Sequence, residues 1–128
     1  MSKFSKTLDQ RVLLMDGAMG TSIHNIPNLD LERDYLGREN CTEVLLMTRP
    51  KLIQDIHESF LAAGSDAVET DSFNSNIHTM EDQDLSDKIF ELNKIASEVA
   101  RAACEKFATP DRPRFVIGSM GPGTKLIS

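Results

Sequence analysis

The sequence predicts an α/β protein in which parallel strands alternate with helices. Three short apolar runs, at residues 12–15, 67–68 and 115–117, each end in small or polar residues. The two stretches that separate these runs are far longer than a hairpin turn. Each of them contains a segment with helical periodicity. Parallel strands need crossovers of a dozen or more residues, usually helical, so we expect right-handed βαβ units.

The first expected strand is Val12–Met15. A continuous apolar run closed by Asp16 and Gly17 is typical of a strand that is covered on both faces. Residues 21–43 then show no sustained period and contain several turn-forming residues. We expect a long irregular excursion there, with at most one helical turn around residues 31–36.

Two helices are expected between the strands. The first begins near Pro50 with Thr48 as its N-cap and ends at Gly64, and its apolar residues recur at helical spacing. The second carries the strongest periodic signal in the chain, from Leu85 to Phe107, with Ser86 as the expected N-cap. The expected buried positions are Ile53, Ile56, Phe60 and Leu61 in the first helix and Leu92, Ala96, Val99 and Ala103 in the second.

Candidate functional residues follow the strands, because ligands of parallel α/β folds collect at the carboxyl ends of the strands. The second strand, from Ala67, ends in Glu69-Thr70-Asp71-Ser72-Phe73, and the third, Phe115–Ile117, is closed by Gly118-Ser119-Met120-Gly121-Pro122. After the first strand, the segment DGAMGT offers backbone amides to an anion such as a carboxylate. The alternative is that Gly17 and Gly20 only permit a tight turn.

Asp16 and Glu69 are the candidate carboxylates of this edge. If their strands are neighbours, the pair is suited to bind a cationic amine or to carry out acid–base chemistry. The alternative is that one of them pairs with Arg11 or Arg49, or caps a turn. Thr70 and Ser72 alternate along the second strand and share the face opposite Glu69, so only one of the two sets points inward unless the strand end is bulged.

The other reactive residue types give weaker signals. His57 falls within the first helix, where packing or surface exposure is expected, while His24 and His78 fall in loops without a partner at metal-ligand spacing. Cys41 and Cys104 are expected to be buried, inert thiols. Because two cysteines do not make a disulfide scaffold, a cytoplasmic location is favoured.

The charge balance narrows the class of partner. Fourteen Lys and Arg against twenty Asp and Glu give a formal net charge of −6, which argues against a nucleic acid or an anionic membrane as partner. No targeting segment or membrane span is visible, and no linker suggests a second domain.

Four strings of the sequence, in this order, carry a family resemblance: RVLLMDGAMGTSIH, DYLGRENCTEVLLMTRP, IHESFLAAGSDAVETDSFNSN and RFVIGSMGPGTKL. They resemble the N-terminal homocysteine-binding domain of cobalamin-dependent methionine synthases. The resemblance implies a (β/α)8 barrel that binds homocysteine at the carboxyl ends of its strands. It also implies that zinc, held by three Cys thiolates, activates the substrate thiol, that methylcobalamin donates the methyl group, and that methyltetrahydrofolate remethylates the cobalamin.

The resemblance also assigns roles to residues of this sequence. Gly121 and Pro122 match a turn that contributes shape rather than chemistry, and Ser72 replaces a Thr that is more usual in the family. No catalytic residue is assigned. The positions that the resemblance implies as substrate-binding are Asp16, Gly17, Ala18, Glu69, Thr70 and Ser72.

The departures from the family set the expected extent of the domain. The family's zinc cysteines lie on later strands, and Cys41 and Cys104 match none of them, so no metal ligand is assigned. Residues 1–128 therefore resemble the first three βα units of a barrel of about 250 residues, and we expect the isolated chain to be inactive and to bind neither zinc nor cobalamin stably. The folate, cobalamin and activation modules would be its partners.

Two alternatives come from other classes of protein. One is a truncated α/β module that binds an amino acid or self-associates, since three parallel strands leave open edges that favour pairing. A doubly wound nucleotide-binding fold would explain the strand–helix pattern but none of the four matched strings.

Overall fold

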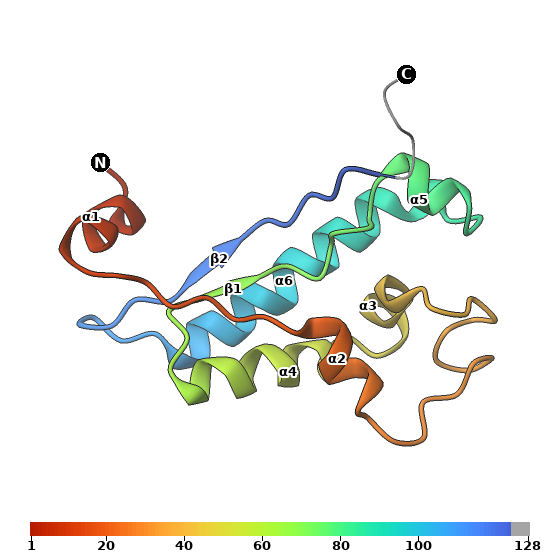
Figure 1. Ribbon diagram of the computed structural model, residues 1–128, viewed down its shortest axis with the longest axis horizontal. Coiled ribbons are helices and arrows are strands. Elements are labelled where there is room, and N and C mark those ends of the chain that lie inside the picture. The colour runs from red at the N-terminus through yellow and green to blue at the C-terminus, as the bar shows by residue number, and fades with distance from the viewer. Residues whose placement is uncertain (124–128) are drawn as a thin grey trace.

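The computed structural model describes residues 1–123 and contains two parallel strands, β1 (Ala67–Glu69) and β2 (Phe115–Ile117). Ala67 lies opposite Phe115, and Glu69 lies opposite Ile117. Figure 1 shows the two strands next to each other, beside the long helix α6 (Ile89–Phe107). The predicted α/β class and the parallel strand direction are confirmed.

The first expected strand runs parallel to β1 but pairs with it only briefly. Met15 forms an isolated parallel bridge with Ala67. The amide of Ala67 donates to the carbonyl of Leu14, and the amide of Asp16 donates to the carbonyl of Ala67, both at 3.1 Å. Residues 12–15 thus lie on the side of β1 opposite β2, and the expected neighbourhood of Asp16 and Glu69 is confirmed.

The expectation that this segment is covered on both faces is wrong. Val12 is 81% exposed and Leu14 is 61% exposed, whereas Leu13 between them is partly buried. Met15 is also 47% exposed, so Leu13 is the one residue of 12–15 that is partly buried. Nothing within residues 1–123 covers Val12 and Leu14.

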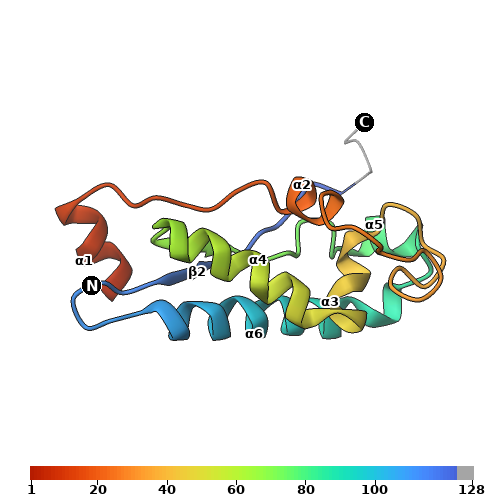
Figure 2. The same ribbon diagram turned by 90° about the horizontal axis from the view of Figure 1, so that it is seen from below.

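The two predicted helices are present and form the main packing layer. Figure 2 shows α6 along one side of the molecule and the extended chain before α2 (Met19–His24) along the other, with α4 (Pro50–Ala63) and β2 between them. The predicted apolar faces of α4 and α6 are buried, except that Phe60, Ile89 and Phe107 are only partly so. The core residues from these helices are Ile53, Ile56, Leu61, Leu92, Ala96, Val99 and Ala103.

The expected helix ends are partly correct. Gly64 ends α4 in the left-handed region, with φ of +118°, as predicted. Thr48 does not cap α4, because it is the last residue of α3 (Leu45–Thr48) and its hydroxyl donates to the carbonyl of Asp34 at 2.6 Å. Ser86 does not cap α6 either, since it begins the 3-10 turn η2 (Ser86–Lys88) that precedes that helix.

The excursion at residues 21–43 is largely irregular, and it contains a buried carboxylate. The side chain of Asp34 is 1% exposed and accepts hydrogen bonds from Arg33 and Arg49, with Arg49 Nη1 at 3.0 Å from Oδ1. These contacts hold the pKa of Asp34 well below its usual range, chiefly through Arg33. The excursion is thereby tied to the start of α4.

Several short elements were not predicted: α1 (Lys3–Gln10), α2, η1 (Thr42–Val44), α3 and α5 (Ile77–Glu81). The helix α2 occupies part of the expected loop, and α5 contains His78, which was expected in a loop. The described part of the chain has no helix that is both long and apolar enough to span a membrane.

Candidate functional site

A cavity of about 220 Å³ lies at the carboxyl ends of the strands. Five of the six residues expected to bind substrate line it, and Ser72 lies directly behind Thr70. The structure therefore brings together residues from three separate segments of the chain at the predicted edge. The lining residues are Asp16, Gly17, Ala18, Met19, Glu69, Thr70, Asp71, Phe73 and Ser119.

The loop that follows the first segment has an unusual backbone. Ala18 adopts a left-handed conformation with φ of 51°, which costs a residue with a Cβ on the order of 1 kcal/mol. Ala18 is the N-cap residue of α2, and its carbonyl accepts from the amide of Ser22 at 2.8 Å. The amides of Gly17 and Ala18 donate to no acceptor within residues 1–123.

The backbone conformation of this loop does not require glycine at residues 17 and 20. Neither Gly17 nor Gly20 has a positive φ, and a Cβ built at either position would meet nothing within 4 Å. The left-handed position is Ala18. A missing side chain at Gly17 therefore leaves open space beside the cavity, which favours the alternative in which a ligand approaches the backbone closely.

Asp16 turns its carboxylate into the protein rather than into the cavity. Its side chain is 5% exposed, and its Oδ1 accepts from the backbone amide of Glu69 at 2.9 Å. Its Oδ2 lies 3.5 Å from Nδ1 of His57, a side chain of α4 that is completely buried. The Asp16 carboxylate thus joins the loop to β1 and to α4.

Hydrogen bonds between the hydroxyl groups of Thr70 and Ser72 and the backbone of Ser119 join the ends of β1 and β2. The amide of Ser119 donates to Thr70 Oγ1 at 2.9 Å, and Ser72 Oγ donates to the carbonyl of Ser119 at 2.9 Å. Since a hydroxyl has one proton, Thr70 must donate to Ser72 across their 2.7 Å contact. Thr70 therefore lines the cavity with its hydroxyl held in place, and Ser72 supports it from behind.

The chain turns at Thr70, which explains why neighbouring residues share the cavity. The amide of Ser72 donates to the carbonyl of Thr70 at 2.8 Å, a turn of three residues. Strict alternation of faces ends there, so both Thr70 and Asp71 line the cavity, together with the exposed side chain of Glu69.

Asp71 is a buried carboxyl group that the sequence did not single out. Its side-chain atom Oδ2 has no hydrogen-bond partner, and the residue is 9% exposed. Burial, together with the nearby charge of Glu43, raises the pKa of Asp71 to about 7. Glu43 is itself only 2% exposed, so two acidic groups share this part of the interior.

The alternative that an arginine pairs with Asp16 or Glu69 is wrong. Arg11 forms a two-pronged ion pair with Asp66, with both N–O distances at 2.8 Å, and Arg49 pairs with Asp34. Both arginines are thus engaged elsewhere, and the carboxylates of the cavity edge remain without them.

The GP turn after β2 serves shape, as expected. A Cβ at Gly121 would lie 2.4 Å from the carbonyl oxygen of Phe73, and the amide of Gly121 donates to that oxygen at 3.0 Å. The last residues of the fourth matched string, 124–126, lie outside the described residues.

The cysteines and histidines of the described residues do not fit a zinc site. Cys41 and Cys104 are buried and free, and burial raises the pKa of each thiol to about 11, so both are protonated at neutral pH. Within residues 1–123 no three His, Cys, Asp or Glu side chains are grouped to hold a metal ion.

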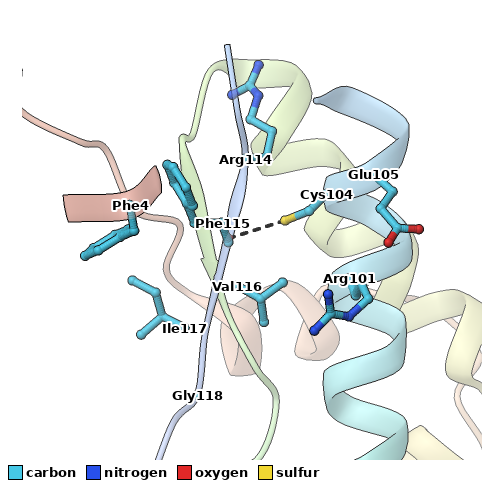
Figure 3. A pocket seen from close by; sticks show the side chains of 9 residues that line it. All are labelled: Phe4, Arg101, Cys104, Glu105, Arg114, Phe115, Val116, Ile117 and Gly118. Carbon is cyan, nitrogen blue, oxygen red and sulfur yellow. Dashed lines mark hydrogen bonds between the residues drawn. The ribbon is translucent and has the colours of Figure 1, made fainter. Parts of the chain in front are cut away.

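A larger cavity, of about 590 Å³, lies away from the strand ends. Figure 3 shows it beside the outer edge of β2, where Phe115 and Ile117 face Phe4 on one side and Arg101, Cys104 and Glu105 of α6 lie on the other. The thiol of Cys104 donates to the carbonyl of Phe115 at 3.3 Å. This groove flanks the unpaired side of β2, so we place the candidate site in the smaller cavity at the carboxyl edge.

The homocysteine S-methyltransferase family model matches residues 13–128. This chain, with its parallel α/β fold and its cavity at the strand ends, belongs to that family.

The methionine synthases of Mycobacterium tuberculosis and Mycobacterium leprae are among the most similar relatives. They are 44% identical over 119 residues and 45% identical over 121 residues. These stretches cover 93% and 94% of this chain but only 10% of either relative, so the chain spans about a tenth of their length.

Among solved structures, the homocysteine methyltransferase MmuM of Escherichia coli, in its metallated form, is similar in fold. The TM-score is 0.69 at 24% identity, over 91% of this chain and 40% of that one. This similarity supports the fold alone.

Proposed function

We propose that residues 1–128 form the N-terminal portion of a homocysteine-binding barrel, its first three βα units, and that the 220 Å³ cavity binds the amino-acid end of homocysteine. The carrying observation is the pair of unpartnered amides at Gly17 and Ala18 beside an open space. Two such amides are suited to a carboxylate.

The rest of the cavity suits the other groups of an α-amino acid. The exposed carboxylate of Glu69 offers a counter-charge for the ammonium group, and the fixed Thr70 hydroxyl has a lone pair left for a ligand N–H. Asp16 contributes through its backbone, because its carboxylate is engaged with Glu69 and His57.

In the complete enzyme, the homocysteine thiol would accept a methyl group and become methionine, with zinc and cobalamin as the cofactors that the family implies and the folate, cobalamin and activation modules as partners. The described residues supply no zinc ligand set. We therefore propose that the isolated chain transfers no methyl group and acts only in binding, in the reducing cytoplasm where its thiols stay free.

Calorimetry with L-homocysteine tests the binding, with Thr70→Ala as the variant and Thr79→Ala, a threonine of α5 outside the cavity lining, as its control. We expect saturable binding that Thr70→Ala weakens about tenfold, the loss of one hydrogen bond, and that Thr79→Ala leaves unchanged. Zinc analysis and a methionine-formation assay complete the test. Stoichiometric zinc with turnover would contradict the proposal that the chain is inactive.

The exposed apolar residues of the first segment favour a second candidate function, self-association. Val12 and Leu14 are largely exposed next to β1, and an uncovered extended edge of this kind is a template for pairing with another chain. Light scattering after size-exclusion chromatography distinguishes the candidates, since a compact monomer at high concentration would exclude self-association.

A further inference from the structure

The buried imidazole of His57 does not line the candidate cavity. His57 lies on the inner face of α4, one turn after Ile53 and one turn before Leu61, and it is 0% exposed. Neither of its ring nitrogens has a hydrogen-bond partner. Because burying an unpartnered polar group is costly, a residue of this kind needs a physical reason.

The nearest such reason is the carboxylate of Asp16. Its Oδ2 lies 3.5 Å from His57 Nδ1, slightly longer than an ordinary hydrogen bond, and both side chains are buried. A movement of a few tenths of an ångström would bring Nδ1 and Oδ2 within ordinary hydrogen-bond distance, and Nε2 would still have no partner within residues 1–123. Catalytic and binding contacts of this kind are often long in unliganded structures and shorten when ligand is bound.

The carboxylate also decides which ring nitrogen carries the proton. A proton on Nε2 alone would direct the lone pair of Nδ1 at the negative Asp16 oxygen, which is repulsive, whereas a proton on Nδ1 makes a donor of it. The other oxygen of Asp16 is already held by the amide of Glu69 at 2.9 Å. With both contacts made, the carboxylate has a single orientation.

We propose that His57 is a positioning residue: its Nδ1–H donates to Asp16 Oδ2 and thereby holds the backbone of Asp16, Gly17 and Ala18 in the geometry that binds the carboxylate of an amino acid. The inference rests on the proposed function for its ligand, but the His57–Asp16 pair itself does not. His57 does not line the cavity, so it acts through Asp16 and not by contact with substrate.

The pair is tested without ligand by nitrogen-15 NMR of the imidazole in the full 128-residue chain. We expect a His57 ring that is protonated at Nδ1, and Asp16→Asn is expected to change its tautomer or shift its Nδ1 resonance. An Nε2–H tautomer, or a His57 spectrum that does not respond to Asp16→Asn, overturns the proposal.

Two replacements separate positioning from packing. His57→Asn keeps an N–H donor close to the Nδ1 position, whereas His57→Leu keeps bulk and removes the donor. We expect His57→Leu to weaken L-homocysteine binding about tenfold, the loss of one charge-assisted hydrogen bond, and His57→Asn to restore most of it. His24→Asn, at an exposed position in α2, is the matched control.

Amide hydrogen exchange keeps the test valid if a variant is destabilised or if the parent binds no homocysteine. The Glu69 amide donates to Asp16, while the neighbouring Thr70 amide donates to Ile117 at 2.9 Å and reports on the sheet. We expect His57→Leu to lower protection of Glu69 more than that of Thr70. If both amides lose protection equally, His57 only packs, and the proposal is overturned. If Glu69 loses more protection than Thr70 but the parent binds no homocysteine, only the proposed function is overturned.

Discussion

At the scale of single residues, the candidate site depends on two backbone amides, those of Gly17 and Ala18, that have no partner within residues 1–123 and lie beside open space. Gly17 is not strained and a Cβ there would touch nothing, while the neighbouring Ala18 accepts a left-handed conformation that costs free energy. Backbone strain of this kind is found at binding sites, and here it lies at the unpartnered amides of Gly17 and Ala18.

Gly17→Ala separates ligand approach from folding. We expect the free energy of unfolding to change by less than about 1 kcal/mol, since the added methyl group meets no atom of residues 1–123. Homocysteine affinity should fall, because the methyl group occupies the space that the ligand needs. The comparison is with Gly118→Ala, which also meets nothing within 4 Å but lies outside the cavity lining. Equal affinities for the two variants would remove Gly17 from the site.

Gly121→Ala, unlike Gly17→Ala, should lower the free energy of unfolding. Its Cβ would lie 2.4 Å from the Phe73 carbonyl oxygen, so the chain must shift, at a cost of about 1–3 kcal/mol. Chemical denaturation of Gly121→Ala and Gly118→Ala measures the difference. A midpoint for Gly121→Ala that matches the Gly118→Ala midpoint would show that the turn tolerates a side chain.

Asp71 gives a prediction about pH. Its folded-state pKa of about 7 exceeds the ordinary value of 3.8, so folding takes up a proton between these values and the chain loses stability as pH rises through them. Asp71→Asn removes this loss. We expect the variant to be more stable than the parent by on the order of 2 kcal/mol at pH 8, with the difference shrinking toward pH 4. Urea melts at both pH values measure it, and a difference independent of pH would contradict the account.

At the scale of elements, the segment before Asp16 is held to the sheet by backbone hydrogen bonds of Leu14 and Asp16 and by the side chain of Asp66. This side chain is 2% exposed and accepts two hydrogen bonds from Arg11 and one from the amide of Leu14 at 3.0 Å. Arg11 holds the pKa of Asp66 well below its usual range. The ion pair therefore places the loop that carries the candidate site.

Asp66→Asn should weaken the attachment of that segment, which keeps its backbone hydrogen bonds to β1. Breaking a pair with one buried partner is expected to cost about 2–3 kcal/mol at neutral pH. Because the folded-state pKa of Asp66 is lowered, its stabilisation is present above about pH 4 and is lost as pH falls further, so parent and variant should converge in acid. Thermal melts of both chains measure this. Asp55→Asn, which breaks an exposed pair with Lys51 on α4, should change little, and an equal loss for both variants would contradict the assignment.

The elements also show what sequence patterns can predict. The helices α4 and α6 follow from periodicity because each offers several turns of evidence. The helices α2, α3 and α5 have at most six residues each, too few for a period to appear, and tertiary packing of residues such as Ile23 and Leu45 stabilises them.

Part of the candidate site was predictable from the geometry of parallel strands. Asp16, Glu69 and Thr70 converge because carboxyl ends of parallel strands meet at one edge. The contact of His57 with Asp16, and the burial of Asp71 near Glu43, depend on packing between elements and leave no short-range pattern. The sequence placed His57 within the first helix and left packing and surface exposure open, and the structure shows that the side chain is buried and faces Asp16.

At the scale of the whole molecule, an open sheet edge and a net charge of −6 oppose each other. The exposed residues of the first segment favour pairing with a second copy, whereas like charge repels it. Which effect dominates depends on ionic strength, because salt screens the repulsion and leaves the apolar contact in place.

Light scattering at low and high salt tests this balance. If the chain self-associates through its first segment, the average mass should rise with salt, and Leu14→Glu should return it to that of a monomer. The control is Phe90→Glu, which changes an apolar side chain that is 82% exposed on α6. Equal effects of the two variants would mean that association is nonspecific.

An NMR titration of the nitrogen-15-labelled chain with L-homocysteine shows whether the cavity at the strand ends binds the amino-acid end of homocysteine. If it does, we expect saturable chemical-shift changes centred on the amides of Gly17, Ala18 and Thr70, with smaller changes at the amide of Glu69. Shifts centred instead on the groove at Arg101 and Cys104, or no shifts up to millimolar ligand, would contradict this binding.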